Sequence, residues 1–275
     1  MVKMLNVTVL ERILQVILAS GYVKGEKPLS AIFVANPECG KTTLIRKYCL
    51  KTDGIFYTTD ATAYGIIRDS DNLMDFHEEK YKHIVIPDLI SCLARKESTV
   101  NTFVYFMGAM IEEGVVNIST YATKIRQADK KKLDVSVGLI TSITPEIFED
   151  KRHRWNKIGF LSRVIPVSYD YDITTRIEIL DFIESEKHLA EKLEKIRFPK
   201  AKRVVIISKE AAKRLEPYTL ALARAQNLYG FRMQRQFQAF LKAIAYLDGA
   251  EEVKEAHFEE FKKLVRFINL DYNKL

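Results

Sequence analysis

The chain has 275 residues, of which 47% are hydrophobic and 29% are charged, and its formal net charge is +7. A chain of this length can bury a full core, and its balance of apolar and charged residues excludes a disordered protein. The mildly basic charge allows an anionic partner such as nucleic acid but does not require one.

Several features bear on where the protein works. The longest apolar run, Phe103 to Ile111, is shorter than the ~18 residues that a membrane-spanning helix needs. Charged residues interrupt the N-terminal stretch early, which is unlike a signal peptide. The three cysteines, Cys39, Cys49 and Cys92, form no C-x-x-C motif, so neither a disulfide framework nor a zinc site is expected. We therefore predict a cytoplasmic protein without a membrane partner.

The stretch from Ala31 to Leu44, AIFVANPECGKTTL, combines the features of a buried strand, a turn and an amphipathic helix. Its first six residues are small or apolar apart from Asn36, as in a strand that is buried on both faces. The stretch matches the pattern G-x-x-x-x-G-K-[ST] except at its first position, where Ala35 replaces glycine. That replacement matters only if the backbone needs a positive φ there. A chance strand–turn–helix that contains a lysine is the plain alternative.

In this pattern, backbone N–H groups and a helix N-terminus face the phosphates of a nucleotide. Lys41 is predicted to neutralise the β- and γ-phosphates of ATP, and the Thr42 hydroxyl is predicted to hold Mg²⁺. The residues of this stretch predicted to bind the nucleotide are Asn36, Pro37, Glu38, Cys39, Gly40, Lys41, Thr42 and Thr43.

A second candidate element is the hydrophobic segment HIVIPDL, residues 83–89, which predicts a strand with an acid at its tip. After a phosphate-binding loop, such an acid orients Mg²⁺ and the attacking water. Two alignments stay open. Either Asp88 orients the metal and the following base is lost to Leu89, or Pro87 takes the metal-orienting position and Asp88 that of the base. A strand-ending turn residue without catalytic duty is the plain alternative.

Further strands are predicted at residues 54–61, 135–143 and 164–169 from their β-branched, aromatic and apolar content. The segment 135–143 ends near Thr141 and Ser142, whose hydroxyl groups could reach between the γ-phosphate and Asp88. Residues 151–157, KRHRWNK, predict a basic loop around the only tryptophan.

A helix is expected over residues 99–113, followed by an alternating segment at 115–121 that is typical of one arm of a hairpin. The expected tip carries one acid, Asp129, among five cations: Lys124, Arg126, Lys130, Lys131 and Lys132. Such a run is either a solvated loop or, in a ring-shaped motor, a loop that grips a phosphate backbone.

From Ile173 onward the composition is typical of helices. Asp172 is predicted to cap a long helix that ends at Pro199. Its expected core face consists of Ile173, Ile177, Leu180, Leu189, Leu193 and Ile196. With two further amphipathic helices downstream, we predict an α/β nucleotide-binding domain over residues 1–171 and an all-helical domain over residues 172–275.

The order of these segments resembles that of the AAA+ ATPase superfamily: a P-loop strand, an acid-tipped strand, a polar-tipped strand, an arginine before the fifth strand and a helical lid. The resemblance implies an α/β fold with a five-stranded parallel sheet sandwiched by helices, followed by a small all-helical lid domain. FYTTDATAYGI, MGAMIEEGVVNIS, GFLSR and RQFQAFLKAIAYL are similar to segments of the minichromosome-maintenance (MCM) helicases, whose group also contains the MoxR-type ATPases.

The resemblance also implies roles for single residues. GFLSR resembles an arginine-finger motif, so Arg163 is expected to reach the nucleotide of a neighbouring subunit. Arg235 best matches the sensor 2 arginine of the lid, with Arg232 as the competing candidate and a surface helix cation as the alternative. Thr141 or Ser142 matches sensor 1, where the family usually has asparagine.

The resulting prediction is an ATPase that hydrolyses ATP at the subunit interfaces of a homo-oligomeric ring or spiral and acts on DNA as an MCM-like motor, helicase or helicase loader. One alternative is a MoxR-like ATPase that remodels a protein partner, and another is a slowly hydrolysing ATP-dependent assembly switch. The predicted catalytic residues are Lys41, Asp88, Thr141, Ser142 and Arg163, and the predicted metal ligands are Thr42 and Asp88.

Overall fold

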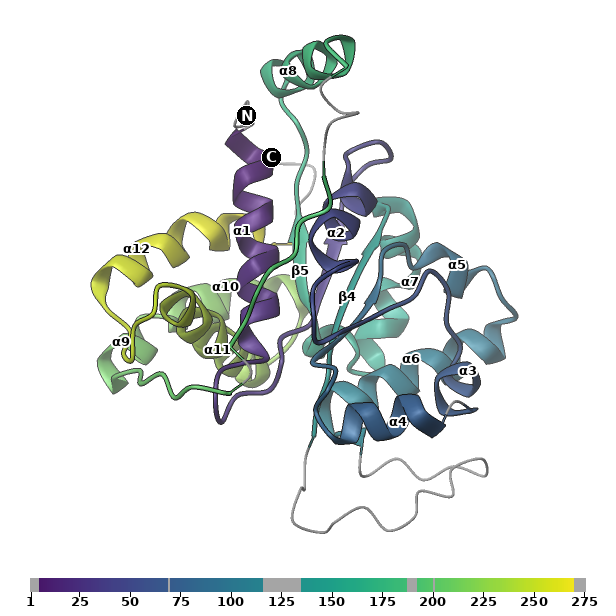
Figure 1. Cartoon of the computed structure of the whole chain (residues 1–275), viewed down its shortest axis with the longest axis horizontal. Coiled ribbons are helices and arrows are strands. Elements are labelled where there is room, and N and C mark those ends of the chain that lie inside the picture. Colours follow the sequence, from purple (N-terminus) through teal and green to yellow (C-terminus); the bar gives the residue numbers. More distant parts are fainter. Residues whose placement is uncertain (1–4, 69, 116–134, 187–191, 200, 270–275) are drawn as a thin grey trace.

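The computed structural model describes residues 5–68, 70–115, 135–186, 192–199 and 201–269 (Figure 1). Five strands form one all-parallel sheet in the order β2-β3-β4-β1-β5. The strands are β1 (Ala31–Val34), β2 (Ile55–Tyr57), β3 (His83–Ile86), β4 (Gly138–Ile143) and β5 (Ile165–Ser168). The predicted α/β class, with five parallel strands flanked by helices, is confirmed.

Helices cover both faces of the sheet, because each strand carries apolar residues at successive positions. On β1, Ala31 and Phe33 belong to one hydrophobic cluster, while Ile32 and Val34 belong to the other. The Ile32 face is covered by α3 (Ala63–Arg68), α4 (Ser70–His77), α5 (Ile90–Leu93), α6 (Glu97–Glu112) and α7 (Pro145–Lys157). On the Phe33 face the hydrophobic cluster contains α1 (Leu5–Ser20) and α2 (Lys41–Cys49), and it continues into α10 (Glu216–Gln226), α11 (Phe231–Leu247) and α12 (Glu255–Leu264).

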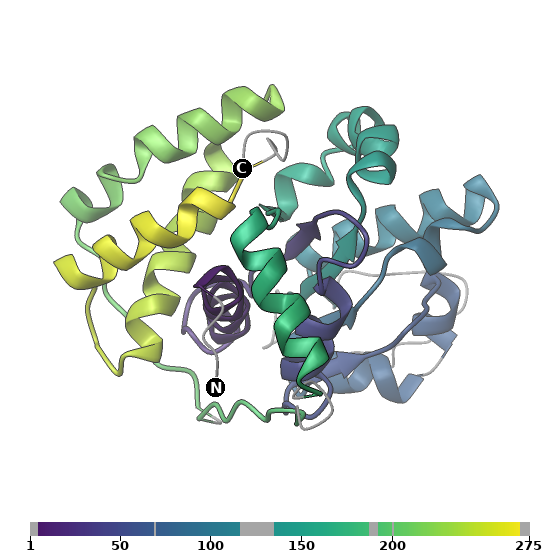
Figure 2. The ribbon, with the colours of Figure 1, turned by 90° about the horizontal axis from the view of Figure 1, so that it is seen from above.

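Helix α1 lies between the sheet and the C-terminal helices (Figures 1 and 2). It packs against α11 and α12, and Arg12 of α1 pairs with Glu260 of α12 at 2.6 Å between Nε and Oε1. One hydrophobic cluster therefore runs from the Phe33 face through α1 into α11 and α12. The predicted boundary between residues 171 and 172 does not separate two cores.

Two sequence predictions about local structure are wrong. Residues 151–157 form the second half of α7 rather than a basic loop, because Phe148 and Trp155 of that helix are buried on one side. The long helix predicted after Asp172 is also shorter: α8 (Ile173–Glu184) is capped by the Asp172 carboxylate and ends at Ser185. Glu186 has a φ of 55°, a left-handed conformation that does not continue a helix.

Helix α8 projects from the carboxyl end of the sheet, away from the other helices (Figures 1 and 2). Its apolar face, which the sequence places in the core, is exposed at Ile173, Ile177 and Leu180. Two short helices, α9 (Lys209–Lys213) and the 3₁₀ segment η4 (Val265–Phe267), flank the C-terminal bundle, and a further 3₁₀ turn, η2 (Leu161–Arg163), precedes β5. Within the described ranges of the chain, no helix has both the length and the apolar content to cross a membrane.

Candidate functional site

The Gly40 loop, residues 35–40, connects the carboxyl end of β1 to the start of α2. Gly40 precedes α2 with φ 70° and ψ 13°, in the left-handed region that glycine enters without steric cost. Its neighbour Glu38 also has a positive φ, of 65°. Gly40 offers no side chain to cap α2, so the first N–H groups of the helix lack a capping oxygen. The loop therefore presents backbone donors at a helix N-terminus, the arrangement that binds phosphate.

The substitution of alanine for the first glycine of the motif is compatible with this loop. Among the described residues, Ala35 does not have a positive φ. Its side chain is buried in the Phe33-face cluster. Gly40 is different, because it does have a positive φ, and a Cβ built on it would meet only the Tyr171 hydroxyl, at 3.8 Å. The loop thus needs glycine at its end and tolerates alanine at its start.

Lys41, the first residue of α2, folds back over the loop. Its Nζ donates hydrogen bonds to the carbonyl oxygens of Ala35, at 2.6 Å, and Asn36, at 2.7 Å. The residue is only 9% exposed, and burial lowers the pKa of its ammonium group. Within the described chain no carboxylate forms an ion pair with it. A buried cation that contacts only carbonyl groups is poorly compensated, so an anion next to the Gly40 loop would fit.

Two tyrosines that sequence reasoning missed hold the turn of this loop. The hydroxyl groups of Tyr169 and Tyr171 both donate to the Cys39 carbonyl oxygen, at 3.0 and 2.9 Å. Burial raises the pKa of Tyr171 to about 12, so its hydroxyl stays protonated at neutral pH. Both tyrosines follow the carboxyl end of β5, which neighbours β1 in the sheet. The signal in the sequence was the pair of aromatic residues just after a strand.

Asp88 lies two residues beyond the end of β3, at the same edge of the sheet as the Gly40 loop. Its Oδ1 accepts a hydrogen bond from the Ile90 amide at 3.0 Å. Its charge acts to raise the pKa of Lys41, against the larger effect of burial. The exposed Thr42 hydroxyl and this carboxylate are the hard oxygen ligands that Mg²⁺ prefers, and Mg²⁺ bound to phosphates needs only one or two of them.

Thr141 and Ser142 do not lie at the strand tip, as the sequence suggested. Both are inside β4 and each is 1% exposed. The Ser142 hydroxyl donates to the Pro87 carbonyl at 2.6 Å and so ties β4 to the end of β3. The Thr141 hydroxyl is buried without a hydrogen-bond partner among the described residues. Neither hydroxyl is free to reach a nucleotide in this arrangement.

The polar residues that do follow β4 are Thr144 and Glu146, and sequence reasoning missed both. Thr144 is half-buried and immediately precedes α7, where its hydroxyl makes no capping hydrogen bond. Glu146, in the first turn of α7, is exposed, and its charge also acts to raise the pKa of Lys41. The hint in the sequence was the Thr-Pro pair, since proline is favoured in the first turn of a helix.

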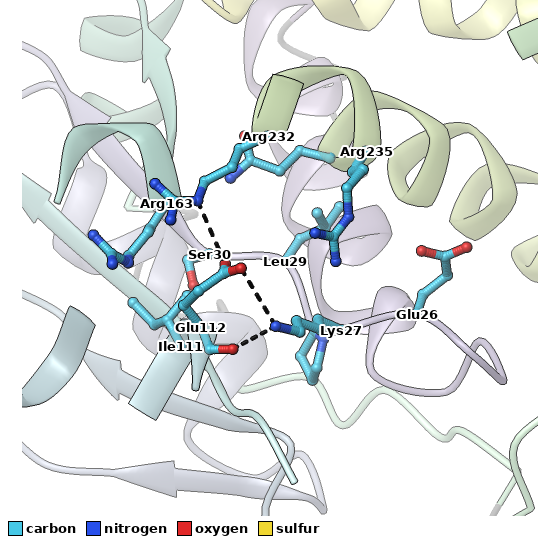
Figure 3. A pocket seen from close by; sticks show the side chains of 11 residues that line it. Glu26, Lys27, Leu29, Ser30, Ile111, Glu112, Arg163, Arg232 and Arg235 are labelled. Carbon is cyan, nitrogen blue, oxygen red and sulfur yellow. Dashed lines mark hydrogen bonds and ion pairs between the residues drawn. The ribbon is translucent and has the colours of Figure 1, made fainter. Parts of the chain in front are cut away.

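The three candidate arginines lie at the other end of the strands. Arg163, Arg232 and Arg235 line a pocket of about 50 Å³ together with Ser30, which precedes β1, and Glu112, at the end of α6. Figure 3 shows Arg232 and Lys27 both reaching the Glu112 carboxylate, with distances of 3.9 and 3.5 Å. Arg232 and Arg235 therefore do not share a site with Lys41 of the same chain.

Arg163 lies in an environment that disfavours its positive charge. Its Nη1 donates to the Gly159 carbonyl at 2.7 Å, whereas its Nε is buried and has no partner in the described chain. Burial, followed by repulsion from Arg232, lowers the pKa of Arg163. Arg232 in turn donates to the Ser162 hydroxyl at 3.0 Å. The pocket has room for a few waters or a small anion, since one water needs about 10–15 Å³.

The predicted site residues thus fall into four groups, one of which is the pair Thr141 and Ser142 buried inside β4. The Gly40 loop with the exposed Asn36, the first residues of α2 (Lys41, Thr42 and Thr43) and Asp88 lie at the carboxyl edge of the sheet. The three arginines lie at its amino edge. The predicted hairpin cations, Lys124, Arg126, Lys130, Lys131 and Lys132, lie outside the described residues.

Comparison with known proteins adds no name to this geometry: no protein-family model matches the sequence, and no curated protein matches it significantly.

Proposed function

We propose that this chain is an AAA+-type ATPase that binds ATP and Mg²⁺ at the Gly40 loop and hydrolyses ATP with the help of an arginine from a second copy. The observation that carries the proposal is the buried ammonium group of Lys41 at the start of α2, whose hydrogen bonds within the described chain go to the Ala35 and Asn36 carbonyls. A triphosphate at the helix N-terminus would supply the missing negative charge.

Each residue at the carboxyl edge has a role in this proposal. The N–H groups of the Gly40 loop and the start of α2 bind the phosphates, and Lys41 moves from the loop carbonyls to the β- and γ-phosphates. Thr42 and Asp88 would hold Mg²⁺, which would offset the negative charge that develops on the phosphates during hydrolysis. Thr144 and Glu146 are the nearest free polar groups after β4, and they orient the attacking water.

The second copy enters because Arg163 and Lys41 belong to opposite edges of the sheet. An arginine that acts on the transferred phosphate must come from another chain if it is Arg163. Arg232 and Arg235 line the same pocket as Arg163, so we propose that all three cations approach the neighbour's nucleotide together. The Nε of Arg163, which has no hydrogen-bond partner among the residues that the structure describes, and its repulsion from Arg232 support an anionic ligand for this group.

DNA as the proposed target is supported by the net charge of +7 and by the cation run at residues 124–132. The decisive assay is ATP turnover by the purified full chain with and without DNA, with Lys41→Ala as the blank. Turnover that Lys41→Ala abolishes and that DNA stimulates in a salt-sensitive manner is the expected result. Turnover that DNA leaves unchanged, together with no DNA binding at low salt, would contradict the DNA part and leave a protein target in its place.

A slowly hydrolysing assembly switch is the second candidate, and one observation favours it. The residue after Asp88, where a catalytic base is common, is Leu89, and this side chain is buried. Asp88 itself accepts a backbone hydrogen bond from Ile90. The switch would be identified if the protein assembles at saturating ATP but hydrolyses less than about one ATP per chain per minute. A median enzyme turns over roughly ten times per second.

A further inference from the structure

We propose that α8 of one copy docks onto the ring pair of Tyr229 and Phe231 of the next copy, so that these two surfaces form the apolar part of the subunit contact. This interface rests on the proposed function, in which the Gly40 loop of one copy and Arg163 of the next copy form one ATP site. It specifies which surfaces bring these two halves of the site together.

The first surface is the apolar stripe of α8, formed by Ile173, Ile177, Leu180 and Ile183. These residues follow one another at spacings of four and three, so they share one side of the helix. They are between 48% and 76% exposed, because α8 projects from the body of the protein (Figure 1). An exposed stripe of large aliphatic residues on a projecting helix is typical of a surface that another chain covers.

The second surface is the ring pair, Tyr229 and Phe231, in the connection between α10 and α11. The rings stack with 5.9 Å between their centroids and 7° between their planes, yet they are 87% and 77% exposed. Gly230 between them has φ 87°, and a Cβ there would lie 3.0 Å from the Ala223 Cβ of α10. The backbone is thus held tightly against α10, while both rings are presented to the outside.

The two surfaces lie on the two halves of the proposed site. Helix α8 begins four residues after Tyr169, whose hydroxyl donates a hydrogen bond to the Gly40 loop. Phe231 directly precedes Arg232, which binds Ser162 beside Arg163. One surface therefore belongs to the nucleotide edge and the other to the arginine edge. A contact between two different surfaces of identical chains is head-to-tail, and it continues to a ring or spiral.

Charge selects a second copy as the occupant. Near its apolar stripe, α8 carries three carboxylates (Glu178, Asp181, Glu184) that form no ion pair with any described residue. The two helices that flank the ring pair carry Arg224, on α10, and Arg235, one turn after Phe231 on α11, both exposed and likewise without a carboxylate partner in the described chain. An acidic, aliphatic helix thus complements a basic, aromatic surface on the same kind of chain.

The test uses two double variants of the full chain, with assembly measured by sedimentation and native mass spectrometry in Mg²⁺ and a non-hydrolysable ATP analogue. The α8 variant is Ile177→Lys with Leu180→Lys, and the ring variant is Tyr229→Ser with Phe231→Ser. All four side chains are exposed, so both variants are expected to fold. Ile206→Lys and Tyr105→Ser are the matched controls, because these residues are similarly exposed on other elements.

We expect each double variant to need about thirtyfold more protein for half-assembly, as for loss of an interface hot spot, while the controls assemble normally. An equimolar mixture of the two variants is expected to form dimers but no longer assemblies, because each pair retains one intact contact. Assembly of both variants at the wild-type concentration, or a wild-type chain that stays monomeric, would overturn the proposal.

Two further readouts distinguish loss of this contact from loss of nucleotide binding and from loss of a nucleic-acid platform. The monomeric variants are expected to bind a fluorescent ATP analogue with the affinity of the wild type. If the wild type does not bind the analogue, the proposed function fails. In that case the docking of α8 on the ring pair is still tested by measuring assembly at high protein concentration without nucleotide. A ring variant that assembles normally but loses a single-stranded oligonucleotide would make the rings a base-stacking platform and overturn the docking.

Discussion

The Tyr171 hydroxyl donates a hydrogen bond to the Cys39 carbonyl oxygen at 2.9 Å, and this contact links the segment leading into α8 to the turn of the Gly40 loop. Arg176 of α8 binds the Tyr171 carbonyl oxygen at 2.8 Å, so the start of α8 and the loop are connected through one residue. A shift of the loop on phosphate binding would therefore be transmitted to α8, the helix proposed to contact the next copy.

Removing this hydroxyl in Tyr171→Phe should loosen the loop without removing the ring. One hydrogen bond contributes about 1 kcal/mol, so we expect the free energy of unfolding to fall by about that amount and ATP affinity to fall up to about fivefold. Denaturant titration and fluorescent nucleotide binding measure the two effects. Tyr105→Phe, on an exposed ring of α6, is the control and should change neither.

Gly40 and Gly25 offer a matched pair for the backbone requirement. Both have a positive φ, of 70° and 85°, and neither has a close neighbour that a Cβ would strike. Gly40→Ala and Gly25→Ala should therefore each lower the free energy of unfolding by about 1–2 kcal/mol, the cost of a left-handed conformation. Only Gly40→Ala should also weaken ATP binding. Equal nucleotide affinities in the two variants would argue against a phosphate site at the Gly40 loop.

Thr141 and Thr144 separate a buried hydroxyl from one at the strand end. Because the Thr141 hydroxyl is buried and has no hydrogen-bond partner in the described part of the chain, Thr141→Val should raise the free energy of unfolding by about 1 kcal/mol and leave ATP turnover unchanged. Thr144→Val should leave stability nearly unchanged and lower turnover at least about tenfold by misplacing the attacking water. The opposite pattern would return the sensor role to Thr141.

His83, the first residue of β3, gives the fold a pH dependence. Its side chain is buried, and burial lowers its pKa to about 4. A histidine in the unfolded chain has a pKa of about 6.5, so between these values the unfolded state binds more protons. The contribution of neutral His83 to the free energy of unfolding is therefore fully present above pH 6.5. This contribution, about 3 kcal/mol, is lost as the pH falls toward 4. In His83→Gln this part of the pH profile should flatten, as unfolding titrations from pH 7 to pH 4.5 will show.

The sequence was most informative where structure is decided locally. The glycine before Lys41 and the apolar run of β1 determine the loop and its strand without reference to the rest of the chain, and both are found as predicted. The number of strands could also be read from apolar segments. Their parallel arrangement in one sheet was implied only by the family resemblance, and their order was not predicted, because periodicity within a strand says nothing about its neighbours.

The sequence failed where an outcome depends on packing between distant segments. The position of Arg232 follows from the contact of α11 with Ser162, 70 residues earlier, which no local pattern encodes. The strand was expected to end at Ile143, as β4 does, but the sequence did not show that Thr141 and Ser142 are buried in the packed sheet, so that Thr144 is the first polar residue after β4. In α7 the many charges masked the spacing of Phe148 and Trp155, which pack on one side of the helix.

The proposed sharing of a site between two copies makes a prediction that a single chain cannot imitate. Lys41→Ala should abolish phosphate binding, and Arg163→Ala should lower turnover by about a thousandfold while nucleotide affinity of the monomer stays the same. Because Arg163 is destabilised by burial and by Arg232, its removal should change the free energy of unfolding by less than about 1 kcal/mol.

In a mixture of the two inactive variants, an Arg163→Ala chain still supplies Lys41, and a Lys41→Ala chain supplies Arg163 at the same contact. Mixing should therefore restore up to about a quarter of wild-type turnover, the fraction of contacts that pair the two chains in the productive order when they assemble at random in equal amounts. A mixture that stays as inactive as its components would mean that Lys41 and Arg163 do not meet across a subunit contact.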